Sequence, residues 1–272
     1  FKKLKKGKQL ELLPYVIGSQ FSYRNDSYDP DSPFINDKVK GDLGIGIKYG
    51  FSSNLTGEIS FNPDFSQVES DAAQINVNSS SAVFYPEKRP FFLDGANIFN
   101  SYINVVYTRM LNNPLYTAKL IGKIDDIDVG YLMGYDQSTP YIIPTKFGSD
   151  FIQTDLRSFG NALRLKKSLK GSSFIGFIGT DHETGDSYNR VAGFDGSFNF
   201  DEKYYFNWEA LGYFTKEMND TSIYDNSVKI NSKGNDAGFN GEKLTGFGGT
   251  FSLVRSSRHW NGEIFMNIAP PE

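Results

Sequence analysis

The sequence predicts an all-β protein: one large antiparallel sheet that forms a membrane-spanning β-barrel around an internal plug segment. First, apolar residues alternate strictly with polar or small ones, as in Leu43, Ile45, Ile47 and Tyr49, which fall on one face of a strand. Second, such segments recur along the chain with few helical stretches between them. Third, short connections alternate with long polar ones, which is typical of outer-membrane barrels.

The composition fits this fold class and excludes several functions. The chain has 272 residues, a size that a single all-β barrel can reach, with 15% aromatic residues and a mean hydropathy of −0.42. A net charge of −4 makes nucleic acid an unfavourable partner. The absence of cysteine excludes disulfides, thiolate metal sites and cysteine nucleophiles. No apolar run is long enough for a membrane-spanning helix.

The barrel is expected to occupy residues 10–272. Residues 1–9 are basic and lack the apolar core of a signal peptide, so we interpret them as a linker from an upstream module. Period-two apolarity predicts twelve strands, at 10–24, 41–49, 55–62, 102–110, 115–124, 127–136, 154–168, 173–181, 190–200, 203–216, 243–256 and 259–268.

The connections between these strands differ in length from one rim to the other. The tight links are 51–54, 125–126, 169–172, 201–202 and 257–258. The long polar links are 25–40, 137–153, 182–189 and 217–242. Short turns on one rim and long loops on the other predict a periplasmic and an outer rim.

Strand parity predicts a plug at residues 63–101. Strand 55–62 would end on the outer side, whereas strand 102–110 would begin on the periplasmic side. The connecting residues must then cross the level of the membrane. Irregular backbone can cross only inside the barrel, because each unpaired amide in lipid costs several kcal/mol.

Two phrases of this connecting segment carry a resemblance to a known family. Residues 62–71 read NPDFSQVESD and residues 84–95 read FYPEKRPFFLDG. They resemble the NPDFxQVExD and FxPEKRPFFLxG signatures of a Bacteroidota outer-membrane barrel family of unknown function. Its members usually carry an N-terminal module similar to family 9 carbohydrate-binding domains. The resemblance extends loosely from Leu10 to Ile268, and it implies that this chain is the front portion of a larger barrel.

The matching residues are the candidate plug site. They are Asn62, Pro63, Asp64, Phe65, Gln67, Glu69, Asp71, Pro86, Glu87, Lys88, Arg89, Pro90, Phe91, Phe92, Asp94 and Gly95. In one interpretation, the cations of this motif line a constriction that gates solutes. In the other, which we favour, they pair with plug or wall carboxylates, and the two phenylalanines fill space against the wall.

Charged residues on the polar face of the predicted strands are expected to line the lumen. They are Asp42, Lys48, Glu58, Lys119, Lys123, Asp128, Asp195, Glu209 and Glu263. Their mixed signs argue against a strongly ion-selective pore. They suit a lumen that holds a plug through polar contacts.

Three functions remain open at this stage. The first is a non-enzymatic barrel of the outer membrane for surface transport or docking, linked to glycan handling because of the sugar-binding-like module in related proteins. The second is a scaffold that binds other envelope proteins through its long loops. The third is a surface glycan hydrolase that uses Glu69, Glu87 and Asp94, since glycosidases need two carboxyl groups. His182, expected in a long loop, and His259 fit no triad or zinc spacing, so no metal or cofactor is expected.

Overall fold

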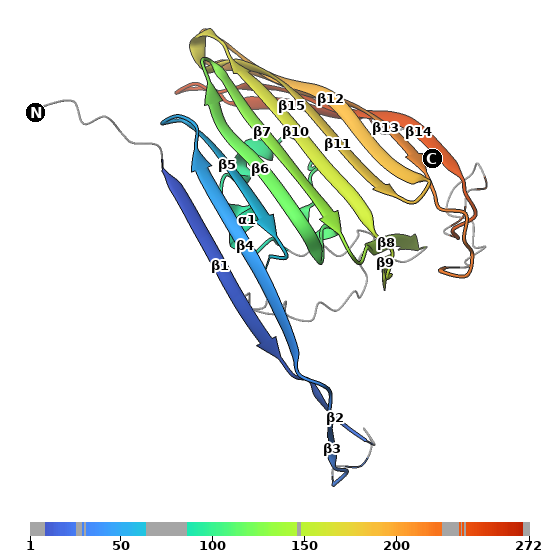
Figure 1. The fold of residues 1–272 in the computed structure, drawn as a ribbon. Helices are drawn as coiled ribbons and strands as arrows, with labels where there is room; N and C mark the ends of the chain where they lie inside the picture. Colours follow the sequence, from blue (N-terminus) through green and yellow to red (C-terminus); the bar gives the residue numbers. More distant parts are fainter. Residues whose placement is uncertain are drawn as a thin grey trace, which may run out of the picture.

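The protein is all-β in a computed structural model that describes residues 9–25, 29, 31–63, 86–145, 148–224, 234, 236 and 238–268. Eleven strands form one antiparallel sheet in the order β1-β4-β5-β6-β7-β10-β11-β12-β13-β14-β15 (Figure 1). Neighbours in the sheet are therefore neighbours, or near neighbours, in the sequence. The all-β class and the large antiparallel sheet are confirmed as predicted.

The strands of this sheet are β1 (Leu10–Ser19), β4 (Lys40–Gly50), β5 (Leu55–Phe61), β6 (Pro114–Ile124), β7 (Ile127–Asp136), β10 (Ser158–Ser168), β11 (Phe174–Thr184), β12 (Ser187–Phe200), β13 (Tyr204–Lys216), β14 (Lys243–Arg255) and β15 (Gly262–Ile268). Two hairpins stand apart from it, namely β2 (Ser22–Arg24) with β3 (Phe34–Asn36) and β8 (Pro140–Thr145) with β9 (Gly148–Gln153). The helical pieces are α1 (Pro90–Leu93), η1 (Ala96–Phe99), η2 (Thr108–Met110) and η3 (Lys170–Ser172).

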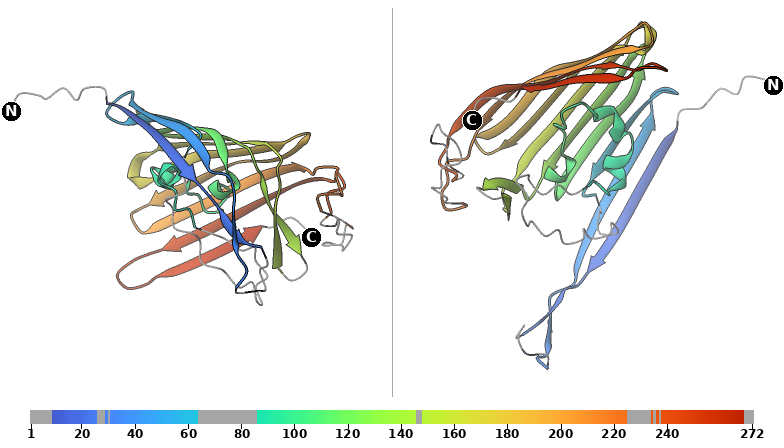
Figure 2. Two further views of the ribbon diagram at one scale, coloured as in Figure 1. Left: turned by 60° about the horizontal axis from the view of Figure 1, so that its bottom comes forward. Right: turned by 180° about the vertical axis from the view of Figure 1, so that it is seen from behind.

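The sheet curls but does not close into a barrel. Its first strand, β1, pairs with β4, and its last strand, β15, pairs with β14. Over the residues that the structure describes, β1 and β15 do not pair with each other. Figure 2 shows the open, curved sheet, with residues 86–113 in its hollow. About twelve strands were predicted for this front portion of a larger barrel, and the main sheet that the structure describes has eleven.

The two faces of the sheet have opposite chemistry. We call the face that carries residues 86–113 the inward face and the opposite one the outward face. On β12 and β13, for example, the outward Phe194 is paired with Ala210, and the inward Asp195 is paired with Glu209. Phe194 is 56% exposed, whereas Glu209 is 0% exposed. A water-soluble domain would arrange these residues the other way round, because burial favours apolar side chains.

The two rims of the sheet differ, as predicted. At one rim, which we call the short-turn rim, the strands are joined by 51–54, 125–126, 169–173, 201–203 and 256–261. The opposite rim, the long-connection rim, carries both hairpins and the connections 62–113 and 217–242.

The predicted long loop at 182–189 is wrong. Strand β11 runs to Thr184 and β12 starts at Ser187, so that only Gly185 and Asp186 form the turn. Gly185 has a φ of 60°, which glycine adopts without strain. The polar residues that looked like a loop continue the two strands. Arg190 donates to Asp181 across them at 2.9 Å.

The predicted strand 102–110 is also wrong, and the parity argument fails with it. This segment is irregular apart from η2, and β5 pairs directly with β6. Residues 62–113 therefore leave and return at the same rim, and no crossing of the sheet is required. The predicted strand 10–24 is interrupted at Gln20 and Phe21, after which β2 leaves the main sheet.

Candidate functional site

The candidate site lies on the inward face, where residues 86–113 pack against the sheet. We call these residues the inner segment. Of the predicted plug residues, Asn62 and Pro63 follow β5, and those from Pro86 to Gly95 begin the inner segment. The predicted residues Asp64, Phe65, Gln67, Glu69 and Asp71 lie outside the described part of the chain.

The Arg89–Glu87 ion pair lies near the start of the inner segment, and its hydrogen bonds to Thr108 and Leu111 join the two ends of the segment. The Arg89 guanidinium donates to both Glu87 carboxylate oxygens, at 2.8 and 2.7 Å. It also donates to the carbonyl oxygens of Thr108, at 2.9 Å, and of Leu111. The Thr108 hydroxyl donates to Glu87 at 2.6 Å. Burial would raise the pKa of Glu87, but the hydrogen bonds from Arg89 and Thr108 outweigh it and lower this pKa to about 2.

Aromatic side chains of the same motif form the main apolar cluster. Phe91, Phe92 and Phe99 are buried together with Leu111 of the segment and with Leu132 of β7. The Arg89 guanidinium lies 4.1 Å from the centre of the Phe92 ring, which is a cation–π contact. The two phenylalanines thus fill space against the sheet, as in the interpretation that we favoured.

Two lysines of the sheet bind residues 91–94 of the inner segment. Lys119 of β6, only 4% exposed, donates to the carbonyl oxygens of Phe91 and Asp94 and lies 3.4 Å from the Glu58 carboxylate. Lys48 of β4 donates to the Asp94 carboxylate at 2.7 Å. The hydrogen bond from Lys48 lowers the pKa of Asp94.

Residues 102 and 103 of the inner segment contact β13. The Ile103 amide donates to the Glu209 carboxylate at 2.6 Å, and the Tyr102 hydroxyl donates to Asn207 at 3.1 Å. Beside them, Arg164 of β10 and Asp195 of β12 form a two-pronged ion pair at 2.5 and 2.6 Å. The inner segment is therefore anchored from β4 to β13, across the whole curve of the sheet.

The predicted wall residues share one face, because the strand register alternates regularly at all of them; the register shift between Pro114 and Tyr116 lies before the first wall residue of β6. Register places all nine on the inward face: Asp42, Lys48, Glu58, Lys119, Lys123, Asp128, Asp195, Glu209 and Glu263. Lys123 and Asp128 pair with each other at 3.7 Å. Arg164 of β10, which lies on the same face, was not among the predicted residues.

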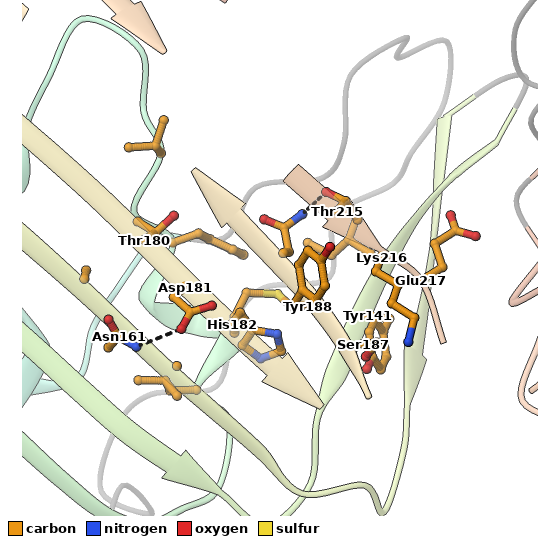
Figure 3. A pocket seen from close by; sticks show the side chains of 18 of the residues that line it. Tyr141, Asn161, Thr180, Asp181, His182, Ser187, Tyr188, Thr215, Lys216 and Glu217 are labelled. Atoms are coloured by element: carbon orange, nitrogen blue, oxygen red, sulfur yellow. Dashed lines mark hydrogen bonds between the residues drawn. The ribbon is translucent and has the colours of Figure 1, made fainter. Parts of the chain in front are cut away.

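A cavity of about 530 Å³ beside the inner segment was not predicted. Figure 3 shows residues from different strands around it, with Thr180 and His182 on β11 and Thr215 and Glu217 at the end of β13. Further parts of its wall come from segment residues 105–108, 110 and 111, from residues 141–143 of β8, and from Asp236 and Phe239. No sequence signal points to it, because these elements are far apart along the chain.

The residues considered for catalysis are placed as follows. His182 lies within β11 rather than in a loop, and His259 lies in the connection between β14 and β15. Both oxygens of Glu87 accept hydrogen bonds, and Asp94 is paired with Lys48. Over the described ranges, no three acidic or histidine side chains are close enough to hold a metal ion. In the same ranges, no helix has the length and apolar character to span a bilayer.

Comparison with protein families matches part of the chain. No curated protein matches the chain. The match covers β1, β4, β5, the inner segment and most of β6, and so includes all the described plug-motif residues. Residues 8–121 match the family described as Domain of unknown function (DUF5916).

Proposed function

We propose that this chain forms part of the wall of an outer-membrane β-barrel, with its outward face against lipid and its inner segment as a plug. The observation that carries the proposal is the inverted polarity of the sheet. Apolar side chains such as Phe194, Phe247 and Ile264 are exposed outward, while charged groups such as Glu209 and Arg164 are buried inward. Exposed apolar surface of this extent marks a binding surface, and lipid fits its band-like form.

The dimensions of the apolar band support this assignment. On β12, outward positions from Ala192 to Phe200 carry no charge, and on β13 the same holds from Tyr204 to Phe214. Each stretch is close to the roughly 9 to 11 residues that a tilted strand needs to cross a bilayer. Charged outward residues lie beyond the band, such as Arg190 and Lys216 towards the long-connection rim.

The plug assignment is supported by the polar contacts of the inner segment. A lumen filled by a segment that is hydrogen-bonded to both sides of the curved wall resists free passage of solutes. We infer a role in surface transport or docking, without catalysis, in the outer membrane. Glycan is the partner that we favour, because the two sequence phrases resemble a family with a sugar-binding-like module.

A scaffold role is the second candidate. Hairpins β2–β3 and β8–β9 and the connection 217–242 all lie at the long-connection rim, where they offer surface to other envelope proteins. The hydrolase has less support, because the two oxygens of Glu87 already accept hydrogen bonds. Stoichiometric partners that co-purify from native membranes, with no conductance in any variant, would favour the scaffold over transport.

The two tryptophans provide a direct test of lipid contact. Trp208 is an outward residue of β13 within the apolar band, and Trp260 lies beside the short-turn rim. We will reconstitute Trp260→Phe and Trp208→Phe, which leave one tryptophan each, in vesicles of brominated phosphatidylcholine. Trp208 should be quenched most by bromine near the middle of the acyl chain. Trp260 should be quenched most by bromine near the headgroup.

Equal weak quenching of both tryptophans at every bromine depth would contradict the membrane assignment. Soluble acrylamide serves as the reference quencher, and it should reach Trp260 more readily than Trp208.

Conductance tests the plug separately. In planar bilayers the intact protein should conduct poorly, and deletion of 63–101 should open large conductance. A milder change, Lys119→Met, removes one anchor of the segment and should give brief openings. A deletion variant that inserts into the bilayer but conducts like the intact protein would show that the segment does not block the path.

A further inference from the structure

The cavity beside the inner segment has the size and lining of a small-molecule site. Its volume of about 530 Å³ lies within the roughly 300 to 1,000 Å³ that is usual for ligand pockets. Apolar side chains such as Val106, Leu111 and Phe239 form much of its wall. It lies at the long-connection rim, between the inner segment and strands β10 to β14.

Three polar atoms in this wall are buried without a hydrogen bond. They are Oη of Tyr141, Nε2 of His182 and Oε2 of Glu217. Buried polar atoms are nearly always hydrogen-bonded, because an unpaired one costs about 1–3 kcal/mol. A bound molecule with hydrogen-bond donors would satisfy all three atoms.

The charges around the cavity indicate whether the bound molecule is a cation or an anion. Of the lining residues that the structure describes, Lys216 is the cationic one, and it is engaged by Asp186 at 2.7 Å. Burial, together with the nearby charges of Glu242 and Asp236, raises the pKa of Glu217 to about 7, although a backbone hydrogen bond from Glu242 opposes this. The site is therefore poor for an anion and good for a cation.

We propose that this cavity binds a small organic ammonium compound, whose charged nitrogen donates to Glu217 and whose apolar body packs against Val106, Leu111 and Phe239. A second polar group of the ligand would reach Nε2 of His182. The inference goes beyond the proposed membrane role, because the cavity needs no contact with lipid to bind its ligand.

The test uses three probes with the same phenyl body and different ends. These are 2-phenylethylamine, 2-phenylethanol and 3-phenylpropionate, titrated against the intact protein held in an amphipathic polymer and followed by calorimetry. The amine should bind at least tenfold more tightly than the carboxylate. Glu217→Gln should weaken the amine at least tenfold and leave the alcohol within about twofold.

The matched control is Glu183→Gln, which removes a carboxylate from the outward face of the neighbouring β11. It should leave the affinities of all three probes unchanged. A carboxylate probe that binds as tightly as the amine, or the absence of binding by all three probes at millimolar concentration, would overturn the inference.

A pH titration of the unmodified protein keeps the test valid if Glu217→Gln fails to fold. Amine affinity should rise several-fold between pH 6 and pH 8, as Glu217 ionises, while alcohol affinity stays flat. Equal pH dependence of both probes would also overturn the inference. The charges of Glu242 and Asp236 act on Glu217 directly, and Lys216, His182 and Asp181 line the same cavity.

Discussion

At the scale of single residues, the inward face holds buried charges in ion pairs and hydrogen bonds. Arg89 is buried against Glu87, Thr108 and Leu111, so its removal would leave a buried carboxylate without its main partner. Breaking a buried pair by removing one partner costs more than the net value of the pair itself, since the remaining charge is still desolvated.

We therefore expect Arg89→Met to loosen the inner segment by about 3–5 kcal/mol. Glu87→Gln keeps the shape of the side chain and one of the two oxygens that accept from Arg89, so its cost should be smaller. Hydrogen exchange of amides in 86–113 measures both. Equal protection in Arg89→Met and the unmodified protein would show that the ion pair does not hold the segment.

Glu87 also sets the acid limit of the segment. Its folded pKa of about 2 lies below the ordinary 4.5, so the stability that its ionisation contributes is complete above pH 4.5 and is lost as the pH falls towards 2. The shift corresponds to about 3 kcal/mol. Proteolysis by pepsin between pH 5 and 2 should show the segment opening in the unmodified protein, with a weaker pH dependence in Glu87→Gln.

Two lysines of β6 allow the loss of a buried hydrogen-bond donor to be compared with the loss of an exposed charge. Lys119 and Lys123 share a face, but Lys119 is buried, whereas the side chain of Lys123 is 40% exposed. Lys119→Met should lower the exchange protection of residues 91–94 about tenfold or more, because their carbonyl oxygens lose a charged donor. Lys123→Met should change it little. A similar loss in both variants would point to general weakening of β6.

At the scale of elements, the strands were predictable and the inner segment was not. A period of two fixes which residues share a face, so the nine charged wall residues fell on one side. The predicted strand 102–110 failed because its β-branched residues pack on the sheet, not within it, with Val106 against the buried cluster. Local alternation does not distinguish these two ways of burying an apolar side chain.

The hairpin at Gly185 shows the opposite error. Its polar residues indicated a loop, yet Asp181, Glu183 and Arg190 form a charged cross-strand group on the outward face. Polarity there marks the end of the apolar band, not the end of the strands. The cavity could not be found in this way, because its wall is assembled by the curvature of the sheet.

Gly95 lies within the inner segment, directly before the helical turn η1. We expect Gly95→Ala to weaken the packing of the segment by about 1–2 kcal/mol. Its φ of +72° favours glycine, and an added Cβ would lie 2.3 Å from Cδ1 of Ile121 on β6. Gly18→Ala on β1 is the control, because nothing lies within 4 Å of its Cβ position. Equal exchange protection of 96–99 in both variants would contradict the close fit.

At the scale of the whole molecule, the inward face of the sheet is polar and the outward face is apolar. The stability of such a sheet depends on the solvent that surrounds it. In water the exposed outward phenylalanines contribute little, whereas in lipid the same surface is matched to its surroundings. The buried ion pairs of the inward face need the curved wall to exclude water from them. The outward band and the inner segment therefore depend on each other through the curvature.

This dependence gives the sharpest prediction, a substitution whose cost changes with the solvent. Phe194→Arg places a charge within the outward band, where a bilayer should make it cost about 2–4 kcal/mol. Thr245→Arg, on the outward face next to Lys243 at the long-connection rim, should cost about 1 kcal/mol or less. Urea unfolding in phosphatidylcholine vesicles measures both. In an amphipathic polymer, the difference between the two variants should shrink. If Phe194→Arg is as well tolerated as Thr245→Arg in vesicles, the outward face does not meet lipid, because no aqueous surface would penalise one exposed arginine over another.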